Sequence, residues 1–152
     1  MPFKSLTATL SVSPQLSEAD VAQAASDGFR AIIDNRPDGE EPGQITAAEM
    51  QLLASFHGMG FAHVPTVGGQ ISDSDVEGMA DAFARLEAPI LAYCRTGTRS
   101  TTLWALTEAG SQSADALIAT AAEAGYDLSA LRPRLETSAP TRSARLSDGP
   151  MS

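Results

Sequence analysis

The stretch that decides the fold reads Ile90-Leu91-Ala92-Tyr93-Cys94-Arg95-Thr96-Gly97-Thr98-Arg99-Ser100. Its first four residues are apolar, which predicts a short strand that is buried on both faces of a sheet. Helical spacing of apolar residues then resumes from Arg99 to Glu108. The stretch therefore predicts a strand, a loop headed by Cys94, and a helix. Ligands gather at such carboxyl ends of parallel strands.

The loop favours a reactive thiolate at Cys94. Gly97 permits close backbone approach, and a turn from strand to helix points several N–H groups into one concavity that suits an anion. The same positive field favours a thiolate over a thiol. Arg99 adds a planar fork of donors for a tetrahedral oxyanion. The alternative is that Cys94 is an ordinary buried side chain. We expect Cys94 and Arg99 to be catalytic and the intervening residues to bind the substrate, namely Arg95, Thr96, Gly97 and Thr98.

Strands and helices alternate along the rest of the chain. Expected strands span residues 7–12, 29–34, 61–64 and 90–93. Capping patterns at Ser17, Thr46 and Ser72 open three helices, and further helices are expected over 99–108, 113–124 and 129–136. This order predicts an α/β fold with a mostly parallel central sheet flanked by helices, in a single domain over residues 1–136. Residues 137–152 have little apolar content and are expected to form a disordered tail.

Composition excludes several classes of function. A chain of 152 residues is the usual size of one domain. Its net charge of −9 opposes nucleic-acid binding, and no apolar run approaches the roughly 20 residues of a membrane span. No secretory signal is visible, so a cytoplasmic location is expected. One cysteine excludes an intramolecular disulfide. Two histidines, His57 and His63, with a distant cysteine make a poor metal set, and we expect no metal and no cofactor.

The loop from Cys94 to Arg99 resembles the active loop of rhodanese sulfurtransferases, whose pattern is Cys-Arg-x-Gly-x-Arg. Over about residues 5 to 136 the chain resembles a bacterial family, the phosphatase-like domain of beta-lactamase-hydrolase-like proteins. The stretches that carry this second resemblance are the cysteine loop, Val12–Gln15, Ile33–Glu40 and Ala124–Leu128. The resemblance implies a cysteine-phosphatase-like fold, and members of the family are described both as phosphatase-like and as sulfurtransferases.

The chain departs from the cysteine phosphatases at two positions. Those enzymes place five residues between the nucleophile and the arginine, and here that position holds Ser100 while Arg99 comes one residue early. They also use an aspartic acid to protonate the leaving oxygen, and Gly68 stands where the resemblance would place it. Asp73 or Asp75 are possible substitutes, although both also fit the start of a helix. Sulfur transfer needs little protonation, so these departures favour it over phosphate-ester hydrolysis.

Two further contacts are suggested by the resemblance. Asp34-Asn35-Arg36 is similar to an Asp-x-Arg motif of rhodaneses, which makes Arg36 a second candidate anion contact. Its alternative role is that of a surface arginine paired with Asp38 or Glu40. Ser100 or the neighbouring Thr101 is expected either to donate a hydrogen bond to the thiolate, as part of the substrate site, or to cap the helix.

The leading hypothesis is a sulfurtransferase that carries a persulfide on Cys94. The first alternative is a phosphatase that acts through a phosphocysteine, and the second is a non-catalytic module that binds or senses an oxyanion. In each case the expected ligand is a small-molecule sulfur or phosphate oxyanion. Some relatives carry a fused metallo-beta-lactamase-like domain associated with persulfide oxidation, which implies a possible partner of that kind in trans.

Overall fold

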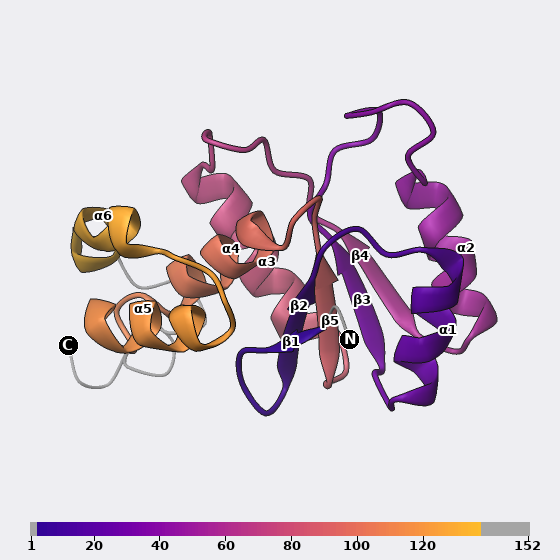
Figure 1. Ribbon diagram of the computed structural model, residues 1–152, viewed down its shortest axis with the longest axis horizontal. Helices are drawn as coiled ribbons and strands as arrows, with labels where there is room; N and C mark the ends of the chain where they lie inside the picture. Colours follow the sequence, from indigo (N-terminus) through magenta and orange to yellow (C-terminus); the bar gives the residue numbers. More distant parts are fainter. Residues whose placement is uncertain (1–2, 138–152) are drawn as a thin grey trace.

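The computed structural model describes residues 3–137 and shows one α/β unit built on a five-stranded sheet (Figure 1). The strands lie in the order β1-β2-β5-β3-β4, and only β1 is antiparallel to its neighbour. The strands are β1 (Lys4–Ser5), β2 (Leu10–Ser13), β3 (Ala31–Asp34), β4 (Gly60–His63) and β5 (Ile90–Tyr93). The helices are α1 (Glu18–Ser26), α2 (Ala47–Phe56), α3 (Asp73–Arg85), α4 (Thr98–Glu108), α5 (Ala114–Glu123), the 3-10 turn η1 (Ser129–Leu131) and α6 (Arg132–Thr137). The predicted fold class is confirmed.

Three helices begin where the sequence predicts. Ser17, Thr46 and Ser72 each accept a hydrogen bond from the third helical N–H, and the acidic side chain at that position bonds back to the backbone of the cap. Each arrangement is a complete capping box, which satisfies two donors that a helix start would otherwise leave unpaired. Local chemistry therefore sets the start of α1, α2 and α3.

The sheet separates two apolar cores because side chains alternate along its central strand β5. Ile90 and Ala92 pack into one core with residues of α3, α4, α5 and α6. Leu91 and Tyr93 face the other, with residues of α1 and α2. Figure 1 shows the same division, with α1 and α2 on one side of the sheet and the remaining helices on the other. Burial on both faces explains the continuous apolar run of this strand.

Four strands deliver their carboxyl ends to one edge of the sheet. In the register of the ladder, Ser13 pairs with Tyr93, Tyr93 with Asp34, and Asp34 with His63. The residues that follow these strands therefore meet at a single edge, although Pro14 and Cys94 are 80 positions apart in sequence. Cys94 follows the central strand, so the loops after its neighbours surround it.

The edges of the fold differ from the sequence expectation. The segment 7–12 was expected as one strand, but the chain pairs β1 with β2 as a hairpin whose turn includes Thr7, which accepts from the N–H groups of Thr9 and Leu10. A two-residue strand carries too little periodicity to be seen in sequence. Thr137 closes α6, and the rest of the expected tail lies outside the described residues. Within residues 3–137, no helix is long and apolar enough to cross a membrane.

Candidate active site

The loop after β5 turns directly into α4, as predicted. Cys94 follows the strand, and Gly97 adopts a φ of 97° immediately before the helix begins at Thr98. Only glycine adopts this left-handed conformation without strain. The turn brings the Gly97 N–H to 3.0 Å from the Cys94 sulfur, to which it donates a hydrogen bond. One of the expected loop amides thus points at the Cys94 sulfur.

The Cys94 side chain is buried with the core residues. Its exposed fraction is 1%. The loop that follows it is polar, and Arg95, Thr96, Thr98 and Arg99 line a cavity of about 560 Å³ at this edge of the sheet. This volume falls in the range of small-molecule sites.

Arg99 is held in place from two sides. Its Nη1 and Nη2 donate to the two carboxylate oxygens of Glu40 at 2.8 and 2.9 Å, and Nη1 also donates to the Thr66 carbonyl at 2.8 Å. The hydrogen bond to Glu40 is the main cause that raises the pKa of Arg99, and the negative charge of Cys94 adds to it. Glu40 takes one edge of the guanidinium, which leaves the Nε edge for another acceptor.

Arg36 binds the same carboxylate and is fully buried. Its Nε donates to Glu40 at 2.8 Å, Nη2 to Glu41 at 2.6 Å and Nη1 to the Gln15 side chain at 2.8 Å. The expectation of a surface arginine is therefore wrong in its placement, although the pairing with Glu40 is present. Arg36 lines the cavity, and its role as a second anion contact stays a prediction. Hydrogen bonds from Arg99 first, and then from Arg36, lower the pKa of Glu40 to about 2.

The expectation for Ser100 is wrong. Ser100 is fully buried, and its hydroxyl donates to the Asn35 side chain at 2.7 Å instead of to the sulfur. Thr101 donates its hydroxyl proton to the Gly97 carbonyl one turn back, at 2.8 Å. A hydroxyl has one proton to donate, so neither residue bonds the thiolate here and neither caps the helix. Ser100 lies in the first turn of α4 and faces Asn35, the residue directly after β3.

The candidate acids lie at the start of α3. The Asp75 carboxylate accepts the Ser72 N–H as part of the capping box, and Asp73 is fully exposed and pairs with Arg134 at 3.3 Å. Gly68 lines the cavity, and a side-chain carbon built on it would meet the Arg99 Cδ at 3.9 Å. The position that lacks an acid therefore faces the loop arginine. Among the described residues that line the cavity, the carboxyl groups are Glu40 and Glu41.

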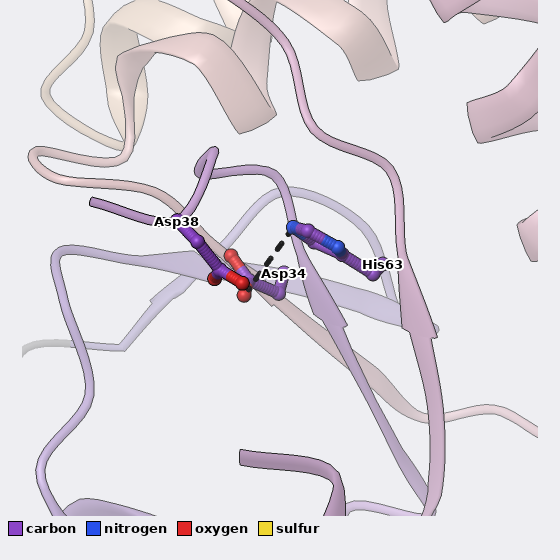
Figure 2. A group of neighbouring side chains, drawn as sticks. All are labelled: Asp34, Asp38 and His63. Atoms are coloured by element: carbon purple, nitrogen blue, oxygen red, sulfur yellow. Dashed lines mark ion pairs between the residues drawn. The ribbon is translucent and has the colours of Figure 1, made fainter. Parts of the chain in front are cut away.

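A second cluster of side chains contacts the backbone of the loop that carries Arg36 and Glu40. Figure 2 shows Asp34, Asp38 and His63 facing one another. One potential ligand atom from each lies within 4.8 Å of those of the other two. Asp34 accepts the Arg36 N–H at 2.8 Å, Asp38 accepts the first N–H of α2 at 2.8 Å, and the His63 Nε2 lies 3.0 Å from the Arg36 carbonyl. Asp38 and His63 are thus engaged with the backbone. Burial raises the pKa of Asp34, which the nearby His63 opposes.

Comparison with known proteins places this site in a family. Residues 2–111 match the model described as the beta-lactamase hydrolase-like protein, phosphatase-like domain. The chain belongs to this family. Curated beta-lactamase hydrolase-like proteins from Agrobacterium fabrum and Xylella fastidiosa are 37% and 33% identical to it, over 66% and 84% of this chain. The chain spans only 23% and 30% of those two proteins.

Solved structures agree with the family on the fold. A protein described as a candidate phosphatase from Neisseria meningitidis is 38% identical, with a TM-score of 0.83 over 91% of this chain and 99% of that one. The core catalytic domain of a PP-IP phosphatase from S. cerevisiae has a TM-score of 0.72 at 14% identity, over 99% and 93% of the two chains. The second likeness concerns the fold alone. This phosphatase-like domain therefore has the cysteine-phosphatase fold that the sequence predicts.

Sequence reasoning considered Glu40 only as a surface partner of Arg36, and it missed other side chains that contact the predicted residues, among them Asn35, Tyr126, Gln15 and Glu41. Glu40 holds both arginines, Asn35 takes the Ser100 hydroxyl, and Tyr126 donates to the Thr96 carbonyl at 3.2 Å. The first two lie within the stretch that carries the family resemblance, directly after β3. The ends of β3 and β5 are neighbours in the sheet. The polar residues after β3 could therefore have been predicted to lie beside the cysteine loop.

Proposed function

We propose that this phosphatase-like domain is a cysteine-dependent phosphatase. The Cys94 thiolate attacks the phosphorus of a phosphomonoester, an S–P bond forms, and the bond to the leaving oxygen breaks. That oxygen departs with the electron pair and takes a proton from solvent water. Water then attacks the phosphocysteine, the S–P bond breaks, and inorganic phosphate and the thiolate are released. Arg99 and the loop amides stabilise the charge on the phosphoryl oxygens.

The observation that carries this proposal is that the Cys94 sulfur accepts a loop amide, and that the same loop leads to Arg99, an anchored guanidinium that lines the cavity. The Gly97 N–H lies 3.0 Å from Cys94, and Arg99 is fixed by two hydrogen bonds to Glu40. Donors that are fixed before the substrate arrives cost no reorganisation during the reaction. The family and the fold of its solved relatives support phosphate as the group that these hydrogen-bond donors bind.

The leaving group is expected to be a weak base. Glu40 has a pKa of about 2, so at neutral pH it is ionised and has no proton to give. Glu41 is bound to Arg36 at 2.6 Å, and Gly68 provides no acid. Esters whose leaving oxygen is acidic, such as aryl phosphates, therefore suit the site better than alkyl phosphates.

Sulfur transfer is the second candidate, and one observation favours it. The spacing from Cys94 to Arg99 leaves four residues between them, as in the rhodanese pattern, and forms a tighter loop. In this reaction the thiolate attacks the outer sulfur of thiosulfate, an S–S bond forms, and the original S–S bond breaks with departure of sulfite. A cyanide or thiol acceptor then removes the sulfur. A partner that oxidises persulfides would act on that product, and co-purification tests for it.

Parallel assays with the same protein preparation separate the candidates. Aryl-phosphate hydrolysis should be measurable in the wild-type chain and lost in Cys94→Ser, while sulfite release from thiosulfate should be minor. Fast sulfite release without phosphate turnover would replace the proposal by sulfur transfer. Binding of phosphate or sulfate without turnover of either substrate would favour a sensing module.

A further inference from the structure

Tyr126 is placed by the end of helix α5. Gly125 adopts a φ of 99°, and its N–H donates to the Ala122 carbonyl at 3.0 Å, while the Tyr126 N–H donates to the Ala121 carbonyl at 2.9 Å. These two bonds form a Schellman motif, which ends a helix and fixes the direction of the next residue. The motif directs the Tyr126 ring toward the cysteine loop.

The phenol of Tyr126 contacts the loop at two points. Its hydroxyl donates to the Thr96 carbonyl at 3.2 Å. It also lies against Gly97 so closely that a side-chain carbon built there would collide with the Oη and Cζ atoms of the ring. Gly97 is thus required both by its backbone conformation and by the tyrosine. The Tyr126 ring can lie this close only because Gly97 has no side chain.

Thr96 and Gly97 share the peptide that links Tyr126 to the nucleophile. In a planar trans peptide the C=O and the following N–H point in opposite directions. The Thr96 carbonyl accepts from Tyr126, and the Gly97 N–H on the opposite side donates to the Cys94 sulfur at 3.0 Å. A hydrogen bond to the carbonyl also polarises the peptide and strengthens its N–H as a donor. We propose that Tyr126 is a positioning residue, which orients and strengthens the amide that stabilises the Cys94 thiolate.

The proposal fits the state of the phenol. Burial, followed by the negative charge of Cys94, raises the pKa of Tyr126. The phenol therefore keeps its proton and remains a donor at neutral pH. Tyr126 lies beyond residues 2–111, which the family model matches. The inference shares with the proposed function only the role of Cys94 as nucleophile.

The test compares the thiolate of wild-type protein with that of Tyr126→Phe, which keeps the ring and removes only the hydroxyl. Cys94 is the single cysteine, so the ultraviolet absorbance that is lost in Cys94→Ser reports its thiolate alone. At a fixed pH at which both forms are present, the ratio of thiolate to thiol should fall about two- to tenfold in Tyr126→Phe, as expected for one hydrogen bond. Ser129→Ala is the matched control, because its hydroxyl bonds to Asp127 at 2.6 Å and lies on the same segment.

Three outcomes decide the question. A fall in the ratio in Tyr126→Phe, with the Ser129→Ala ratio and the melting temperatures unchanged, supports the proposal. An unchanged ratio in Tyr126→Phe overturns the proposal. If phosphate turnover were lost while the ratio stayed unchanged, the phenol would act on the leaving group instead. The thiolate measurement uses no substrate. An altered ratio in a protein without phosphatase activity would therefore reject the proposed function and keep the role of Tyr126.

Discussion

Glu40 and Arg99 form a bidentate ion pair, in which each carboxylate oxygen lies within 2.9 Å of a guanidinium nitrogen. The two residues are 59 positions apart, on the loop after β3 and on the first turn of α4. Planar pairs of this kind restrict the orientation of the guanidinium as well as its position. The carboxylate therefore anchors the arginine that we assign to the oxyanion.

Replacement of Glu40 by Gln is expected to lower kcat/KM for an aryl phosphate by about 10- to 100-fold, because one charge-assisted pair is lost and Arg99 gains freedom. Steady-state kinetics of the variant give the measurement. Glu87→Gln is the control, since Glu87 pairs with Arg30 on the exposed surface at 3.4 Å. A faster Glu40→Gln enzyme would show instead that Glu40 competes with the substrate for Arg99.

The same residue predicts how stability changes in acid. The pKa of Glu40 is about 2 in the folded chain, below its ordinary value of 4.5. Its contribution to stability is therefore complete above about pH 4.5 and is lost as the pH falls toward 2. Part of the side chain is exposed, so we expect a contribution of about 1 kcal/mol after solvent screening. Denaturant unfolding should show a smaller loss between pH 5 and pH 3 for Glu40→Gln than for wild type, and equal losses would contradict the assignment.

Arg99→Lys keeps the charge and loses the planar fork. A lysine ammonium cannot form bidentate hydrogen bonds to Glu40 and to an oxyanion as the guanidinium does. Competitive inhibition by inorganic phosphate should weaken by about 1 to 3 kcal/mol, measured as an inhibition constant. Arg85→Lys, in the last turn of α3, serves as the control. Unchanged inhibition in Arg99→Lys would give Arg99 a structural role only.

Gly68→Asp introduces a carboxyl beside Arg99 at the position that lacks an acid. The built side-chain carbon lies 3.9 Å from the Arg99 Cδ, an ordinary contact. Because the guanidinium favours the ionised carboxylate, alkyl-phosphate turnover should rise less than about tenfold, far below the 10²- to 10⁴-fold of an effective general acid. Gly68→Asn controls for shape. A gain of about 10²-fold or more would mean that the acid alone was missing.

The sequence predicts best what short-range chemistry decides. The capping boxes at Ser17, Thr46 and Ser72 each lie within four residues, and all three form as predicted. The loop from Cys94 into α4 is equally local. The strand β1 escaped prediction because its two residues take their conformation from pairing with β2.

The contacts around the loop depend on separate segments and were harder to predict. Periodicity indicates that Ser100 is helical, but only the position of α4 beside the loop after β3 turns its hydroxyl to Asn35 instead of the sulfur. Tyr126 reaches the Thr96 carbonyl because a Schellman motif 30 residues later in the chain aims it there. Such pairings need the position of whole elements, which no local pattern contains.

The most direct test of the account is the mass of the intact protein after rapid acid quenching of a reaction with an aryl phosphate. We predict a covalent adduct with the mass of one phosphoryl group, located on Cys94 by peptide mapping and absent from Cys94→Ser. The adduct should disappear once the substrate is consumed, because water hydrolyses the phosphocysteine. A chain that never acquires the phosphoryl group, but gains the mass of one sulfur from thiosulfate, would contradict the phosphatase account.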